Sequence, residues 1–237
     1  MSYSTLREEI PSGGLRWYIP DDPEVTRVPV FFAPGSFALS GPYNWIGEAL
    51  VQAGHTVGMI SLGIYDVVTS WEKGISDAKA FAHRRFGTET YRIIGHSLGA
   101  NGALIYAGPD RDCAGIVALC PAYATRTSNV HRNLINNACT NENYRSSTLF
   151  IAGGVDTVSP AEGVALHYNN LHSHTDSHNA PHTKFVTIDG ASHAQFMNTL
   201  MSSFYRILLD DVEPTIPTQT VHDIVLEEVL DWFNQEP

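Results

Sequence analysis

The sequence contains few cysteines, and they form neither a disulfide framework nor a metal-binding pair. Cys113, Cys120 and Cys139 are the only three among 237 residues, and none lies in a CxxC motif. A chain of this length buries enough apolar surface to fold without disulfides. One bridge between Cys120 and Cys139 and three free, buried thiols are both compatible with the sequence.

Basic residues and long apolar runs are also scarce. Only 14 lysines and arginines stand against 25 aspartates and glutamates, so the formal net charge is −11. This charge disfavours nucleic acid and anionic membrane surfaces as partners. No apolar run approaches the roughly 20 residues that cross a bilayer, so we expect no membrane span. Residues 1–14 have no apolar h-region, so we expect no secretory signal within them.

The rest of the sequence alternates strand-like apolar runs with helical patterns. The expected strands are residues 14–19, 28–33, 56–61, 91–94, 115–120, 148–152 and 184–188. The expected helices are residues 42–53, 71–86, 98–107, 161–168, 194–209 and 220–234. This order predicts one α/β domain over residues 1–237, with a mostly parallel sheet flanked by helices on both faces. Two polar stretches, 126–145 and 169–182, match neither pattern, and we interpret them as surface insertions.

The pentapeptide Gly95–Gly99 (GHSLG) has the GxSxG pattern of a sharp turn that exposes a nucleophilic serine. An expected strand precedes it and an expected helix follows it, which is the context that the motif requires. A tight turn whose serine has no function is the alternative. The context favours Ser97 as a nucleophile, with the amide of Leu98 as one donor to an oxyanion.

A nucleophilic serine needs a histidine as its base and an acid that orients the histidine. After a GxSxG motif the acid precedes the histidine along the chain. Asp156 follows an expected strand, although it would also suit a turn or the start of the next helix. His193 lies in the short loop after the last expected strand, where a solvated histidine is the alternative. Asp189 is a rival acid, but it lies only four residues before His193. We therefore predict Asp156 as the acid and His193 as the base.

The second oxyanion donor is expected on the loop after the strand 28–33. Gly35 lets the backbone turn there, which points to the amide of Ser36. The alternative is that Pro34 and Gly35 only form a turn.

Several histidines lie close together in the second half of the chain. They are His167, His172, His174, His178 and His182. Their spacing matches no defined metal-site pattern, and their neighbours are mostly Asn, Ser and Thr. We therefore predict no metal site there.

Taken together, the stretches with motifs resemble the bacterial cutinase-like polyester hydrolases, the group that includes the poly(ethylene terephthalate) hydrolases. More distantly, they resemble the dienelactone-hydrolase-related branch of the same superfamily. The matching stretches are residues 13–20, 33–36, 45–47, 95–99, 120–123, 155–160 and 189–193. The resemblance implies an α/β-hydrolase fold and a shallow, open cleft that binds esters.

The resemblance also implies residues for substrate binding. The oxyanion loop of that family carries an aromatic residue; here Ser36 stands at its position, with Phe37 next to it. His96 matches the His or Trp that precedes the nucleophile. Tyr123 stands where the family has a tryptophan, and a packed tyrosine is the alternative.

Two features depart from the family. The stretch 126–145 is longer than the corresponding loop, and no cysteine follows Cys139, whereas secreted members carry a pair near the C-terminus. The resemblance implies a secreted protein, and a cytoplasmic one is the alternative.

These observations predict a serine carboxylic ester hydrolase. We expect it to act without a cofactor, as a monomer, on a small-molecule or polymeric ester. Activity on polyesters rests on the resemblance alone. The same three side chains would also serve the hydrolysis of amides, lactones or thioesters. A hydrolase-like binding module is the non-enzymatic alternative.

Overall fold

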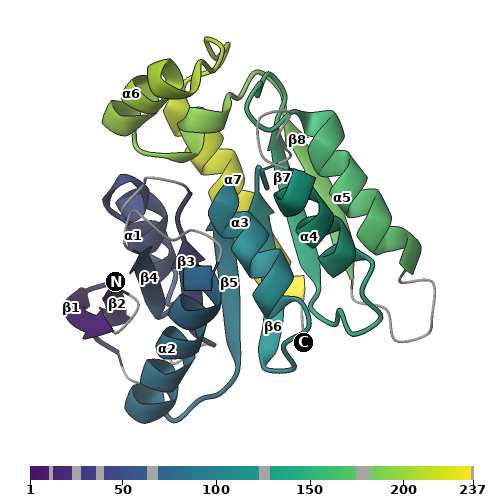
Figure 1. Ribbon diagram of the computed structural model, residues 1–237. Coiled ribbons are helices and arrows are strands. Elements are labelled where there is room, and N and C mark those ends of the chain that lie inside the picture. The colour runs from purple at the N-terminus through teal and green to yellow at the C-terminus, as the bar shows by residue number, and fades with distance from the viewer. Residues whose placement is uncertain are drawn as a thin grey trace.

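The computed structural model of the protein describes residues 1–10, 13–22, 28–35, 40–62, 69–122, 129–174 and 182–235. In this part of the chain, strands form one sheet of eight in the order β1-β2-β4-β3-β5-β6-β7-β8 (Figure 1). Their bounds are Tyr3–Ile10 (β1), Gly13–Pro20 (β2), Val30–Ala33 (β3), Val57–Leu62 (β4), Tyr91–His96 (β5), Cys113–Leu119 (β6), Thr148–Gly153 (β7) and Thr183–Ile188 (β8). β2 pairs antiparallel with β1 and β4, and all the other pairs are parallel.

The helices lie in the connections between the parallel strands and after the last of them. Their bounds are Asn44–Gln52 (α1), Thr69–Phe86 (α2), Leu98–Gly102 (α3), Asn129–Cys139 (α4), Ala161–His174 (α5), Thr199–Leu209 (α6) and Thr218–Gln235 (α7). Gly41–Tyr43 (η2) and His193–Phe196 (η4) form short 3-10 turns, and Ala103–Ala107 (η3) is a wider turn that continues α3. Parallel strands need such crossovers because each strand must start again from the same edge.

The central strands are apolar along their whole length rather than at alternate positions. All the residues of β3, β5 and β7 are buried, and β6 is buried except at its second position. This pattern is typical of parallel strands that are covered on both faces. The predicted fold class, a mostly parallel sheet flanked by helices on both faces, is confirmed.

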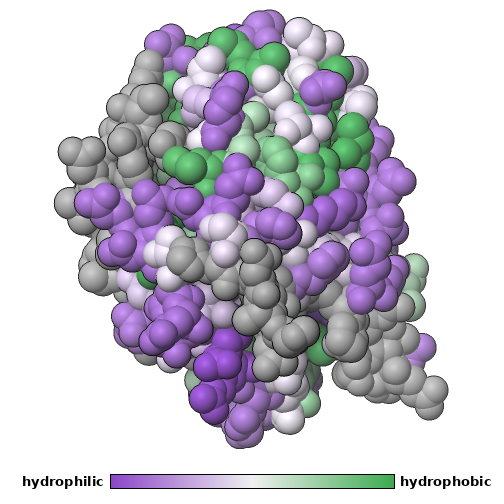
Figure 2. Space-filling view, turned by 90° about the vertical axis from the view of Figure 1, so that its right-hand side faces the viewer, coloured by the Kyte–Doolittle hydropathy of each residue, from purple (hydrophilic) through white to green (hydrophobic). Residues whose placement is uncertain are grey.

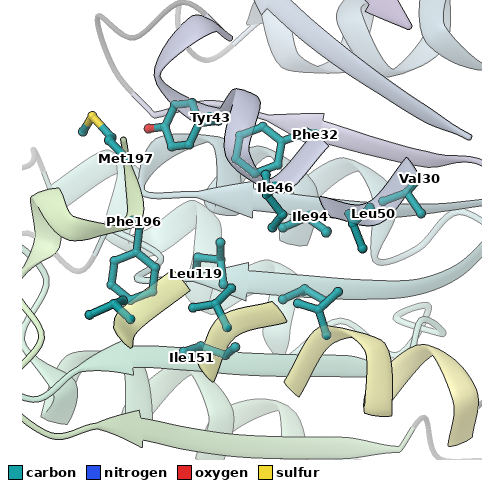
Figure 3. Close-up of a cluster of buried hydrophobic side chains, with 14 of the residues drawn as sticks. Val30, Phe32, Tyr43, Ile46, Leu50, Ile94, Leu119, Ile151, Phe196 and Met197 are labelled. Carbon is teal, nitrogen blue, oxygen red and sulfur yellow. The ribbon is translucent and has the colours of Figure 1, made fainter. Parts of the chain in front are cut away.

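Two hydrophobic cores lie on opposite faces of the sheet. The first packs α1 and α7 against the sheet, and the second packs α2, α3, α4 and α5 against it. Figure 3 shows part of the first core, where side chains of the strands meet those of α1. The labelled residues of the strands are Val30, Phe32, Ile94, Leu119 and Ile151, and those of α1 are Ile46 and Leu50. The strands are thus fixed from both faces, which holds the loops at their carboxyl ends in place.

The structure differs from the predicted elements at four places, namely β1, α4, the end of α5 and the stretch 194–209. β1 was not expected, because Arg7, Glu8 and Glu9 interrupt its apolar pattern, as charged residues often do in an edge strand. The stretch 126–145 contains α4, in which Ile135, Ala138 and Cys139 are buried at helical spacing among asparagines. α5 continues to His174, into the stretch 169–182, and buries Leu171. Whether the two stretches are insertions relative to similar proteins stays a prediction.

The stretch expected as one helix over residues 194–209 is divided in two. The turn η4 begins at His193, and α6 begins only at Thr199, where the Asn198 side chain accepts a hydrogen bond from the Met201 amide (2.9 Å). Asparagine is a preferred N-cap, so it starts a new helix rather than continuing the old one.

α6 carries an apolar outer face. Leu200, Phe204, Ile207 and Leu208 are exposed at helical spacing, Leu200 with 81 % of its surface. Figure 2 shows the side of the molecule that lies to the right in Figure 1, where hydrophobic residues also gather in the upper part. Nothing of comparable helical spacing is found among the other exposed large hydrophobic residues that the structure describes.

Cys113, Cys120 and Cys139 are buried and form no disulfide, so the structure has no bridge between Cys120 and Cys139. Among the described helices, none is both long and apolar enough to cross a membrane.

Candidate active site

Ser97 occupies the sharp turn between β5 and α3. Its backbone has φ 55° and ψ −123°, a conformation that residues other than glycine rarely adopt. The amide of Ser97 donates to the carbonyl of Leu119 at the end of β6 (2.9 Å), and 9 % of the residue is exposed. Strained backbone of this kind persists only where the surroundings impose it, and it often marks a functional position.

The two glycines of the motif allow this turn to pack against its neighbours. A Cβ atom on Gly95 would lie 2.5 Å from the Cα atom of Ala100 in α3. A Cβ atom on Gly99 would overlap the carbonyl oxygen of Ala33 at the end of β3. The GxSxG pattern is therefore required by close backbone approaches on both sides of Ser97.

Asp156 and His193 form a buried hydrogen-bonded pair. Asp156 follows β7 and His193 follows β8, and His193 Nδ1–H donates to Asp156 Oδ2 (2.7 Å). The other carboxylate oxygen, Oδ1, accepts from the amides of Val158 (2.8 Å) and Ser159 (2.6 Å). A carboxylate only accepts hydrogen bonds, so it holds the proton of the imidazole on Nδ1 and leaves Nε2 as a free acceptor.

The environment of His193 favours its protonated form. Burial acts to lower the pKa of His193, but the negative charge of Asp156, the hydrogen bond to it and the charge of Asp211 together raise this pKa above its usual value. A histidine with a raised pKa is a stronger base than one in water.

His96, the residue before Ser97, lies against the imidazole of His193. The imidazole rings of His96 and His193 lie 4.7 Å apart between centroids, and His96 also stacks on Phe196. Burial and the neighbouring His193 lower the pKa of His96 well below its usual value, so His96 is neutral. The predicted nucleophile, base and acid thus follow β5, β8 and β7, with His193 bonded to Asp156 and in ring contact with the neighbour of Ser97.

Tyr43 holds the loop that follows β3. Its buried hydroxyl accepts from the amide of Gly35 (3.2 Å) and is bonded to His96 Nδ1 (2.8 Å). Burial raises the pKa of the Tyr43 hydroxyl, which stays neutral. A Cβ atom on Gly35 would lie 3.1 Å from the Cβ of Ser97, so this loop touches the serine. The role of Tyr43 could not be seen in the sequence, because its partners lie in other elements.

Of the residues predicted for the oxyanion hole and for substrate binding, the structure describes only Leu98 and His96. Leu98 is the first residue of α3, and amides in the first turn of a helix have no acceptor within the helix. Ser36, Phe37 and Tyr123 lie outside the described residues, so their roles stay predictions. His96 is fully buried, which favours a role in supporting the turn over contact with a substrate.

Two further groups surround the pair, and the sequence did not reveal them. Cys120, with φ 43°, follows β6, and burial and the charge of Asp156 raise the pKa of its thiol well above its usual value. Asp211 follows α6 and lies close enough for its charge to act on His193. The possible ligand atoms of Cys120, Asp156 and His193 lie within 4.8 Å of one another. Hydrogen bonds already occupy both oxygens of Asp156, so this trio is better suited to proton transfer than to holding a metal.

The other candidate groups lie elsewhere. Asp189, the rival acid, is exposed. His167 is buried, and burial lowers its pKa to about 4. His172 is bonded through Nδ1 to the Thr183 hydroxyl (3.0 Å), and His182 stacks on Trp232. Among the residues that the structure describes, these histidines do not form a group that could hold a metal. The side chain of His174 and all of His178 lie outside this part of the chain.

The fold is shared with solved structures, among them a serine hydrolase homologue and an esterase domain. "Crystal Structure of TT1662 from Thermus thermophilus" superposes with a TM-score of 0.63 at 18 % identity, over 89 % of this chain and 96 % of that one. An alpha-beta serine hydrolase homologue from Coxiella burnetii gives 0.60 at 17 %, over 88 % and 96 %. The esterase domain of a Rhodothermus marinus protein gives 0.59 at 17 %, over 89 % and 97 %. Neither a protein-family model nor a curated protein matches the sequence. At these identities the likeness shows the fold alone, and the chain has the α/β-hydrolase fold.

Proposed function

We propose that this protein is a serine hydrolase of carboxylic esters, with Ser97 as nucleophile, His193 as base and Asp156 as the acid that orients the base. The observation that carries the proposal is the buried 2.7 Å hydrogen bond between His193 and Asp156, next to a strained serine turn. Three segments that are distant in sequence meet there, and a purely structural role would not require this combination.

The reaction proceeds in two steps. Ser97 Oγ attacks the carbonyl carbon of the ester while His193 Nε2 takes the hydroxyl proton. The bond to the alcohol then breaks, and His193 returns the proton to the leaving oxygen. In the second step His193 Nε2 takes a proton from water, and the resulting hydroxide attacks the acyl carbon on Ser97. The bond from that carbon to Ser97 Oγ then breaks, His193 returns the proton to Ser97 Oγ, and the carboxylic acid is released. Throughout, Asp156 keeps the imidazole oriented and stabilises its positive charge.

The charge on the tetrahedral intermediate needs its own donors. The amide of Leu98 at the start of α3 is one of them, and we propose the amide of Ser36 as the other. This assignment is supported by Gly35, which precedes Ser36 and packs directly on Ser97.

Esters are favoured as substrates by the similar structures, one of which is an esterase domain and another a serine hydrolase homologue. A polyester as substrate is the narrower proposal, and it rests on the resemblance to cutinase-like hydrolases, with Phe37 and Tyr123 as residues that contact the chain. The enzyme needs no metal or organic cofactor for this mechanism. We propose that a single chain carries the complete site.

The proposal is tested by hydrolysis of p-nitrophenyl acetate and butyrate by the wild-type protein and by Ser97→Ala. The control is Ser203→Ala, because Ser203 is an exposed serine on α6. We expect Ser97→Ala to lose at least about 10³-fold in kcat with an unchanged circular dichroism spectrum, and Ser203→Ala to keep full activity. Turnover of Ser97→Ala within ten-fold of wild type would refute the proposal. A panel of esters of increasing chain length, with release of soluble acids from a polyester film as one arm, then decides the substrate class.

A further inference from the structure

The connection between α6 and α7 lies against the loop that carries His193. α6 ends at Leu209, and the left-handed backbone of the next residue, Asp210 (φ 53°), turns the chain. The Thr215 amide then donates to the carbonyl of Gly190 (2.9 Å), and Gln195 Nε2 donates to the carbonyl of Ile216 (2.8 Å). This connection therefore follows the His193 turn on both sides of the histidine.

Asp211, the first residue of this connection after the turn, also reaches the loop of Asp156. Its Oδ2 accepts from the amide of Ala194 (3.2 Å). Its Oδ1 accepts from the amide (3.3 Å) and the hydroxyl (3.2 Å) of Thr157. Ala194 and Thr157 are the residues that directly follow His193 and Asp156. One buried carboxylate, only 7 % exposed, thus joins the two loops immediately beyond the hydrogen-bonded pair.

We propose that Asp211 is a positioning residue for the His193–Asp156 pair, holding the two loops at the separation that the pair requires. The proposal rests on the function proposed above. Asp211 does not contact the reacting atoms, so it acts through the backbone of the two loops.

The physical basis is that each loop leaves an amide without a partner in its own segment. The amide of Ala194 is buried, and a buried amide without an acceptor costs about 1–3 kcal/mol, so Asp211 stabilises the His193 loop through this bond. Its two bonds to the exposed Thr157 attach the Asp156 loop to the same carboxylate. Because the two amides are adjacent to the pair, a shift of either loop moves the imidazole or the carboxylate directly. Displacements of about 1 Å in a catalytic site commonly cost about 100-fold in rate.

The charge of Asp211 provides a second, separate effect. It favours the protonated form of His193 and so contributes to the raised pKa of that histidine. The titratable groups that face His193 or its turn from the neighbouring elements are His96, Cys120, Asp156, Asp211 and His222. Of these, His96 is neutral because burial lowers its pKa, and Cys120 is a neutral thiol because burial raises its pKa. Among the described residues, the negative charges that raise the pKa of His193 are those of Asp156 and Asp211.

The test compares Asp211→Asn with Glu213→Gln. Both remove one negative charge from the same connection, but Glu213 is exposed and pairs with Arg206 (2.6 Å) instead of joining the loops. Two readouts are measured: kcat and KM on p-nitrophenyl butyrate across pH, and the titration of the His193 imidazole by NMR, assigned by its loss in His193→Gln.

We expect Asp211→Asn to lower kcat by about 10- to 100-fold with KM within about two-fold. The acid limb of the pH profile and the NMR titration of His193 should both move to lower pH, because the neutral imidazole is then favoured. Glu213→Gln should change neither. A residue with only a structural role would lower stability without moving the titration. Wild-type kcat together with an unchanged titration in Asp211→Asn would overturn the proposal.

Two further measurements separate the remaining cases. If Asp211→Asn does not fold, Asp211→Glu is used instead, because it keeps the charge but places the carboxylate farther from the backbone. A lower kcat with an unmoved acid limb of the pH profile supports the proposal. Wild-type kcat in Asp211→Glu overturns it. Were the wild-type protein to hydrolyse no ester, the proposed function would fail. The NMR titrations of wild type and Asp211→Asn would still decide whether Asp211 controls His193.

Discussion

Replacing Asp156 by asparagine tests the geometry of the His193–Asp156 pair more sharply than truncating the Asp156 side chain would. One oxygen of Asp156 accepts from two backbone amides, and the other accepts from His193. Asparagine has a single oxygen, which we expect to stay with the two amides. Its NH₂ group then faces His193 Nδ1, which must become an acceptor. The imidazole proton moves to Nε2, where it blocks the acceptor that Ser97 needs.

The size of the effect follows from what is lost. The variant keeps the shape of the site, but His193 has the wrong tautomer and no negative charge to stabilise its protonated form. In the serine protease used as the standard example, the same change costs about 10⁴-fold in kcat. We expect about 10³- to 10⁴-fold here, which corresponds to about 4–5.5 kcal/mol at 1.36 kcal/mol per decade.

The assay is the pH dependence of kcat/KM on p-nitrophenyl butyrate, with Asp189→Asn as the control. Asp189 is exposed and lies in the turn before His193, so its variant should stay within about two-fold of wild type. Because Asp156 raises the pKa of His193, the acid limb of Asp156→Asn should also move to lower pH. Activity of Asp156→Asn within ten-fold of wild type, or a larger loss in Asp189→Asn, would refute this reasoning.

Two further changes address the surroundings of the serine turn. Gly99→Ala places a Cβ against the Ala33 carbonyl, so we expect it to lower the free energy of unfolding by about 3–5 kcal/mol and Tm by about 10 °C. In the control Gly41→Ala the new Cβ meets no atom within 4 Å, so Tm should stay unchanged. Equal melting temperatures of the two variants would contradict the close approach. Tyr43→Phe leaves the Gly35 amide without its acceptor, so kcat on p-nitrophenyl butyrate should fall about ten-fold while the chain stays folded. Wild-type kcat in this variant would show that Tyr43 does not anchor the loop after β3.

The fold class could be predicted because the central strands are continuous apolar runs. Strands such as β3 and β7 are buried on both faces, so their hydrophobicity does not depend on register. Ser97, Asp156 and His193 could be proposed from the sequence because they follow three expected strands, in the chain order that a GxSxG motif requires. Parallel strands bring their carboxyl ends to one edge of the sheet, which places these residues on the same edge.

The supporting residues could not be predicted in the same way. Asp211 stands beside Asp210 in an acidic stretch, and its partners Ala194 and Thr157 lie 17 and 54 residues away. Nothing local distinguishes the buried aspartate from its neighbour. Tyr43 is joined to His96 across 53 residues, and its role depends equally on the tertiary structure.

α4 and β1 were not predicted from the sequence for a different reason. The buried residues of α4 are separated by asparagines, which have a low helix propensity, so the composition of the segment resembles a loop. The charged residues of β1 hide a strand that is stabilised by pairing with β2. Packing against the rest of the protein, rather than local preference, determines both elements.

The most direct test of the site is labelling with a fluorophosphonate, which reacts with a serine only when a neighbouring base activates it. Mass spectrometry of the treated protein should show one adduct per chain, located by peptide mapping on Ser97, and no adduct in His193→Ala. The absence of an adduct from the folded wild-type protein, or an adduct on another serine that persists in Ser97→Ala, would contradict the assignment of Ser97 as the activated nucleophile.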